Sequence, residues 1–140
     1  MGTGYNLFRY PGTVRMHETS QLPTAALVQR AASLCADNKA VDVLILNLQG
    51  VTEMTDFFVI ASGTSDTHVR SLADRIQEEL KKDGVVAHHA EGLAQGRWVL
   101  LDYVDFVVHL FHPALRSFYQ LERLWSDAVV VPVDSQGAGA

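Results

Sequence analysis

Two apolar runs separated by a short polar hinge decide the fold of this chain, in the stretch Arg97-Trp98-Val99-Leu100-Leu101-Asp102-Tyr103-Val104-Asp105-Phe106-Val107-Val108-His109-Leu110-Phe111. Each run has the length of a strand, so the stretch predicts a β-hairpin with strands over 97–101 and 105–111. Because side chains alternate between the two faces of a strand, Trp98, Leu100 and Asp102 share one face of the first strand. On the second strand, the side chains expected to share one face are Asp105, Val107, His109 and Phe111.

Trp98 admits two interpretations that the hairpin pattern does not separate. A large aromatic side chain beside carboxylates near a turn suits a protein docking surface. Tryptophan is also usually largely buried in folded proteins, which would make Trp98 a core residue. Loss of the indole would reduce binding under the first interpretation and stability under the second.

The composition predicts one domain with a sizeable core. The chain has 140 residues, of which 48% are hydrophobic and 19% charged, and this length is typical of a single domain. Its net charge of −5 argues against a broad phosphate-binding surface and predicts little direct nucleic-acid binding, whereas a basic partner is compatible. No apolar run approaches the ~20 residues of a membrane span, so no membrane partner is expected. The single Cys35 lies beside an apolar helical stripe and is expected to be buried rather than nucleophilic.

The two ends of the chain differ from its body, which we expect to form one domain over 22–131. Residues 1–21 have no clean periodicity and contain several glycines, which predicts a flexible leader or tag. Residues 132–140 are rich in Gly and Ala and predict a flexible tail. We expect a cytoplasmic protein of bacterial type, with an organellar matrix as the alternative if the leader is a transit peptide.

Hydrophobic periodicity outside the hairpin predicts further elements in the order α-β-β-α-β-β-β-α. The first helix is expected from about Leu22 to Ala36, with Ser20 as its cap. The other expected elements are strands over 41–48, 56–61 and 85–89, a helix over 66–82 that stops at Gly84, a last helix from Pro113 through Ala128, and a short extended piece over 129–131. This mixture predicts an α/β fold in which helices pack on a mixed sheet of about five strands.

The turn Ser62-Gly63-Thr64-Ser65 lies between a predicted strand and a predicted helix, where backbone N–H groups can bind an anion. Nucleotidyltransferases have a similar turn, together with two carboxylates one residue apart on a following strand that hold metal ions. The strand expected over 85–89 has no acid, and Asp102 and Asp105 have the wrong spacing. A nucleotide site that uses the backbone of 63–65 and magnesium is therefore the weaker alternative to a plain capped turn.

The histidines do not form a recognisable metal motif. His88 and His89 are neighbours and point to opposite faces of a strand, so both cannot easily hold one zinc ion. Together with Glu91, His109 and His112 they include neither H-E-x-x-H nor paired cysteines. We therefore expect no metal and no cofactor.

Four sequence blocks run through the body: DFFVIASGTS at 56–65, EG at 91–92, GRWVLLDY-D-VVHLF through 96–111, and RSFYQLERLW at 116–125. In this order and spacing they resemble the ribosomal silencing factor family, also called RsfS or Iojap. The resemblance covers nearly all of the body. Four further matches to the family motifs are expected to be structural, namely Asp56, Arg116, Tyr119 and Glu122.

The resemblance implies a translation repressor that is not an enzyme and needs no cofactor. Family members bind the large ribosomal subunit through its universal protein fourteen, on the face that meets the small subunit, and so block subunit joining. The resemblance also implies a nucleotidyltransferase-like core without its catalytic acids, and a homodimer in the free state. It assigns partner binding to the hairpin residues Trp98, Leu100, Asp102, Tyr103 and Asp105, and less strongly to Glu91 and His109.

One position of the hairpin turn departs from the family pattern. Many relatives have Gly where this chain has Val104, between Tyr103 and Asp105. A β-branched residue is unfavourable at positive φ. We therefore expect the turn type, and with it the pose of Tyr103, to differ here.

Overall fold

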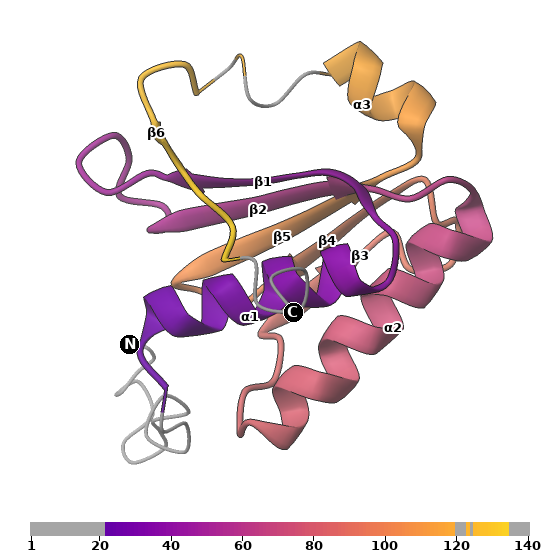
Figure 1. Ribbon diagram of the computed structural model, residues 1–140, viewed down its shortest axis with the longest axis horizontal. Coiled ribbons are helices and arrows are strands. Elements are labelled where there is room, and N and C mark those ends of the chain that lie inside the picture. Colours follow the sequence, from indigo (N-terminus) through magenta and orange to yellow (C-terminus); the bar gives the residue numbers. More distant parts are fainter. Residues whose placement is uncertain (1–21, 120–122, 124, 135–140) are drawn as a thin grey trace.

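The computed structural model describes residues 22–119, 123 and 125–134. Within these ranges three helices pack on a six-stranded sheet of order β3-β4-β5-β2-β1-β6 (Figure 1). The elements are α1 (Thr24–Asp37), β1 (Val41–Asn47), β2 (Phe57–Ser62), α2 (Asp66–Lys82), β3 (His89–Glu91), β4 (Trp98–Asp102), β5 (Phe106–Phe111), α3 (Pro113–Tyr119) and β6 (Val129–Val131). Strands β2 and β5 are parallel, and the other neighbours are antiparallel. The predicted α/β class with a mixed sheet is confirmed, with six strands rather than five.

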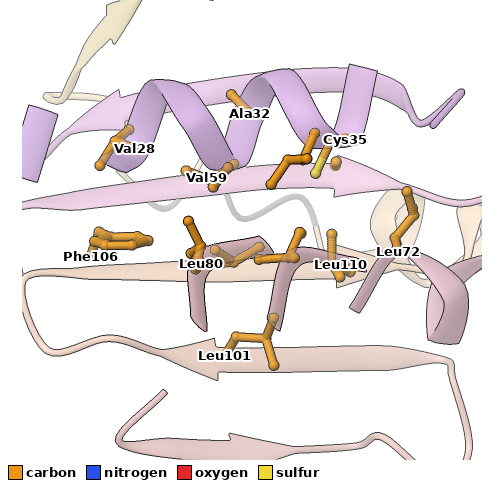
Figure 2. Packing of buried hydrophobic residues seen from close by; sticks show 14 of the residues in the cluster. Val28, Ala32, Cys35, Val59, Leu72, Leu80, Leu101, Phe106 and Leu110 are labelled. Carbon is orange, nitrogen blue, oxygen red and sulfur yellow. The ribbon is translucent and has the colours of Figure 1, made fainter. Parts of the chain in front are cut away.

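The larger hydrophobic core lies between the sheet and the helices α1 and α2, which cover one side of it (Figure 1). Figure 2 shows Val28 and Ala32 of α1 above Val59 of β2, with Leu80 of α2 nearby. Full burial of a side chain of this size contributes roughly 1.5–3 kcal/mol, so this side carries most of the packing energy. Cys35 belongs to this core and is 0% exposed, which confirms its expected burial. Burial raises the pKa of its thiol to about 12, so the thiol is unreactive.

A smaller core occupies part of the opposite face of the sheet. Its buried members are Leu46, Leu48, Ile60 and Phe111. The side chains that cover it come from α3 and the segment before β6, and they are Leu115, Trp125 and Ala128. This cluster reaches β4 only at Trp98. The rest of the β3–β4 half of this face therefore lies outside both cores.

The N-terminus of α1, the C-terminus of α2 and the start of β3 can each be compared with the sequence predictions. Helix α1 has Pro23 at its N-cap without a side-chain cap, and Ser20 lies outside the described residues. Gly84 ends α2 at φ 85°, as predicted.

The strand expected over 85–89 is wrong in its first half, because the Val85 N–H still donates to the C=O of Leu80 in α2. The first backbone hydrogen bond to β4 comes from the His88 N–H, which donates to the Asp102 C=O at 2.7 Å, and regular strand pairing begins at His89.

The C-terminal part differs from the expected helix through Ala128. Helix α3 is described as far as Tyr119, residues 120–122 and 124 lie outside the described ranges, and residue 123 is helical. Residues 125–127 form a turn, so the expected helix does not continue to Ala128. The extended piece over 129–131 is a sixth strand, paired with β1. Residues 132–134, assigned to the tail, are bound to α1, since Gln29 Nε2 donates to the Pro132 C=O at 2.9 Å. No helix in the described part of the chain has both the length and the apolar character needed to span a membrane.

Candidate functional site

The register between β4 and β5 places the predicted docking side chains on one face of the sheet. The facing pairs are Trp98 with Phe111, Leu100 with His109, and Asp102 with Val107. Val99 and Leu101 alternate with them and are 0% exposed under the helices. The predicted shared face of Trp98, Leu100 and Asp102 is therefore confirmed, and it is the face that α1 and α2 do not cover.

Trp98 is half-buried, and a hydrogen bond holds the edge of its ring. Its Nε1–H donates to Nδ1 of His109 at 3.2 Å, and its ring centroid lies 4.9 Å from that of Phe111. His109 is 5% exposed, and burial lowers its pKa to about 4. The imidazole is therefore neutral at pH 7, so Nδ1 can accept the indole hydrogen. His109 therefore exposes too little surface to contact a partner, and its role is to position the Trp98 ring. Trp98 itself lies partly in the core and partly at the surface.

The hairpin turn places Val104 at φ 73°. The Asp105 N–H donates to the Tyr103 C=O at 2.9 Å, which makes a three-residue γ-turn of the rare and strained kind with positive φ at its centre. Two hydrogen bonds hold Val104 there, from its N–H to Asp102 Oδ1 at 2.8 Å and from Thr55 Oγ1 to its C=O at 3.0 Å. Val104 therefore has positive φ despite its β-branched side chain. The expected difference in turn type from the relatives stays a prediction. Strained residues held in this way cluster at functional sites, and the Val104 side chain is 48% exposed.

Tyr103 lies on the other side of the sheet from the predicted docking residues. Its ring stacks on Phe106 with centroids 4.9 Å apart and planes at 12°, and it belongs to the core under the helices. The side chain is 7% exposed, and burial raises the pKa of its hydroxyl to about 12. The assignment of Tyr103 to the docking face is corrected: the ring supports the turn from below, because the residue after Asp102 alternates to the helix side.

Acidic side chains border this face. Asp102 and Asp105 are half-buried at the turn end of the hairpin. Glu91 on β3 lies opposite Leu100 and is exposed, and its Oε2 is 2.7 Å from Nε2 of His89. Glu91 therefore continues the face across β3, and its role in partner binding stays a prediction.

Two residues of this face were absent from the predicted site. Val107 is half-buried opposite Asp102, and the exposed His89 faces Asp102 from β3. The alternation in the hairpin could have identified Val107, whereas the pairing of the short β3 cannot be read from sequence. We define the hairpin patch as Glu91, Trp98, Leu100, Asp102 and Val107.

Two of the three backbone N–H groups over 63–65 that an anion could use already donate within the protein. The Gly63 N–H donates to the Phe111 C=O at 2.9 Å, and the Thr64 N–H donates to His68 Nδ1 at 2.8 Å. Ser65 caps α2 by accepting from the His68 N–H at 3.0 Å. A Cβ on Gly63 would lie 2.8 Å from Val69, so glycine here permits close helix packing. This geometry favours a capped turn over a nucleotide site.

His89, His109 and His112 each have a different partner in the structure. His109 is buried against Trp98, His89 contacts Glu91, and His112 Nε2 is 3.9 Å from Asp66 Oδ1. Over the described ranges, no group of three His, Cys, Asp or Glu side chains has an arrangement that could hold a metal ion.

Of the four residues expected to be structural, the structure describes the contacts of Arg116 and Asp56. Arg116 Nη1 donates to the Asp42 C=O at 2.7 Å and to Ser62 Oγ at 3.2 Å, so it ties α3 to β1 and β2. The Asp56 N–H donates to the Asp105 C=O at 3.0 Å and so supports the hairpin turn. The side chains of Tyr119 and Glu122 lie outside the described residues.

Known proteins resemble this chain in both sequence and fold. A family model described as "Ribosomal silencing factor during starvation" matches residues 21–139. A Bacillus subtilis protein named ribosomal silencing factor RsfS is 38% identical over 109 residues, which cover 78% of this chain and 92% of the relative. The crystal structure of a Bacillus halodurans protein is similar with a TM-score of 0.69 at 37% identity, over 78% of this chain and 99% of that one. An X-ray structure of a Chromobacterium violaceum protein has a TM-score of 0.66 at 33% identity, over 81% and 88% of the two chains.

The family match spans both cores and the hairpin patch. It agrees with the four blocks of sequence and with the observed fold. The chain therefore belongs to the ribosomal silencing factor family.

Proposed function

We propose that this protein silences ribosomes by binding the large subunit and blocking its union with the small one. The observation that carries the proposal is the family match over residues 21–139, supported by relatives that are named for ribosome silencing. The mechanism is steric: no bond is made or broken, and no cofactor takes part. Affinity and placement on the subunit then decide the effect.

The hairpin patch is the docking surface in this proposal, and the universal protein fourteen of the large subunit is its partner. Trp98 acts as the anchor, because half-buried aromatic side chains that become fully buried carry much of the energy of protein interfaces. Leu100 and Val107 extend the apolar centre of the patch. Asp102, Asp105 and Glu91 form a rim that would guide a basic partner and mainly change the association rate.

The free protein is a homodimer in this proposal, and its location is the cytoplasm. Exposed valines on the edge strand β6 are compatible with self-association, since Val129 and Val130 are 66% and 57% exposed. Light scattering at micromolar concentration should therefore give about twice the 15.4 kDa of one chain. A mass equal to that of one chain would contradict the homodimer without affecting the proposed binding to the large subunit.

Sedimentation with separated ribosomal subunits tests the central proposal. The protein should sediment with large subunits, remain in the supernatant with small ones, and reduce the joined-particle peak when both are mixed. Equal binding to both subunits, or an unchanged joined peak at a stoichiometric excess of protein, would contradict it.

A nucleotide-incorporation assay tests the absence of catalysis. With magnesium and labelled nucleoside triphosphates, the purified protein should transfer no label to protein or RNA. Transfer that disappears in a Gly63→Ala or Ser65→Ala variant would replace the silencing mechanism with an enzymatic one.

A further inference from the structure

An open strand edge lies at the end of the sheet formed by β3. This strand is the first in the order β3-β4-β5-β2-β1-β6, so within the described part of the chain no strand pairs with its outer edge. Successive residues of an edge strand direct their backbone groups to opposite sides, and every second residue therefore points its N–H and C=O outward. Such an edge can accept an additional strand from another chain.

A groove of about 610 Å³ runs beside this edge, between α2 and the segment 86–90. The helix wall consists of Asp74, Gln77, Glu78 and Lys81, a spacing that places all four on one face of α2. Val86, on the opposite wall, is 51% exposed. Of the lining residues 86–90, only His89 and Ala90 belong to β3. The groove therefore runs beside the first two residues of the edge strand and continues along the irregular segment that leads into it.

The charges on the helix wall select a basic occupant. Asp74 and Glu78 make no ion pair with any described residue, whereas the adjacent Glu79 is paired with Arg30 and Lys82. Side chains four residues apart on a helix are separated by about 6 Å along its axis. Alternate residues of a strand are separated by about 6.6 Å. In a peptide that runs along α2, two basic side chains at alternate positions would therefore match the spacing of the two carboxylates.

We propose that the β3 edge and this groove bind a basic, extended segment of a partner protein. The segment adds to the sheet beside β3 through its backbone, with Lys or Arg at two alternate positions facing Asp74 and Glu78. Val86 supplies an apolar contact, and Lys81 disfavours a third basic residue at the next alternate position. This site shares Glu91 of β3 with the hairpin patch and otherwise uses different residues. The inference does not rest on the ribosomal proposal.

Titration with a short peptide tests the inference without ribosomes. The probe is acetyl-Val-Lys-Val-Arg-Val-amide, and binding is followed through backbone amide shifts in NMR spectra of the intact protein. The largest shifts should occur over 86–91 and along α2 from 74 to 81. The same peptide with Glu in place of Lys and Arg, and a form N-methylated at alternate residues, should both fail to bind. Absence of binding by the probe, equal binding by the N-methylated form, or shifts confined to the hairpin patch would overturn the proposal.

Two matched double variants test the role of the carboxylates. Asp74→Asn with Glu78→Gln should weaken peptide affinity about three- to tenfold at low salt, because two exposed ion pairs are lost. Glu53→Gln with Asp127→Asn removes the same charge at exposed positions that do not line the groove, and it should leave the affinity unchanged. Equal weakening by both double variants would assign the effect to net charge and overturn the proposed site.

Discussion

The two faces of β4 and β5 have the same backbone and different surroundings. Val99 and Leu101 lie under the helices and are 0% exposed, whereas Trp98 and Leu100, one residue away, are only half-buried. The helix layer covers the first face, whereas the smaller core reaches the second at Trp98 of β4 and Phe111 of β5. Neighbouring residues of one strand can therefore serve stability and recognition separately.

The largest expected difference between the faces is in stability. Leu101→Ala should lower the free energy of unfolding by about 2–5 kcal/mol, because it leaves a cavity in the core. Leu100→Ala makes the same chemical change on the other face and should cost about 1 kcal/mol or less. Urea denaturation of both variants measures the contrast. Equal losses would mean that the two faces are equally packed.

The pH dependence of stability reports on His109. Its pKa is about 4 in the folded protein and about 6.5 when unfolded, so the unfolded state binds more protons between these values. The stabilisation is complete above pH 6.5 and is lost as the pH falls towards 4, by up to about 3 kcal/mol. Urea denaturation at pH 7.5, 6 and 5 should show this loss in the wild type and a smaller one in His109→Asn. Parallel profiles would show that His109 is not the titrating group.

Replacement of Trp98 separates anchoring from core packing. Trp98→Ala should weaken binding to the large subunit by on the order of 2 kcal/mol, or about thirtyfold. The same variant should lower the free energy of unfolding, because the hydrogen bond to His109 is lost. The loss should be smaller than the ~3–5 kcal/mol expected for a fully buried Trp. Trp98→Phe is the control that keeps a ring without the N–H donor. Thermal melting and subunit affinity are measured on the same samples, and a large loss of stability with unchanged affinity would make Trp98 a core residue only.

Relief of the strained turn should give a smaller change of opposite sign. Val104→Gly should raise the free energy of unfolding by about 0.5–1 kcal/mol, because a penalty of about 1–2 kcal/mol for a left-handed L-residue is partly offset by the entropy of Gly in the unfolded chain. Val104→Ala keeps the strain and should give no such gain. Chemical denaturation distinguishes the two variants. A Gly variant less stable than the wild type would show that the valine side chain makes contacts that outweigh the strain.

The smallest expected effect concerns the acidic rim. Asp105→Asn should weaken binding to the large subunit by about two- to fivefold, with the greater loss at low salt, because exposed charges contribute about 0.2–1 kcal/mol and are screened. Association rates measured at two salt concentrations check this expectation. Glu91→Gln should behave in the same way. A salt-independent loss would place these carboxylates in direct buried contact with the partner.

Much of the fold follows from patterns along the chain. The sequence predicts the hairpin and α2 to within one residue, because alternation and helical spacing depend on nearby residues only. The same alternation correctly predicts that Trp98, Leu100 and Asp102 share a face. The docking role that the family resemblance implied for Tyr103 does not agree with this alternation, since the residue after Asp102 lies on the helix side and is buried there.

Other features depend on distant parts of the chain. The predicted start of β3 is wrong, because a bond to the end of α2 holds Val85 away from β4. The role of His109 also escapes the sequence pattern, because its burial comes from Phe58 on β2 and Trp98 on β4, brought together by strand pairing. No local pattern reports such a contact.

By itself, the sequence determined the fold class, the hairpin, the faces of the two hairpin strands and the family resemblance, since these depend on residue spacing and motif order. Only the tertiary structure decided which face the helices cover, that Trp98 is held by a neutral His109, and that Val104 occupies a strained turn. The physical reason is that burial and hydrogen bonding are set by elements far apart in sequence. A strand pattern specifies two faces, and the packing of α1, α2 and α3 determines which residues of those faces remain available to a partner.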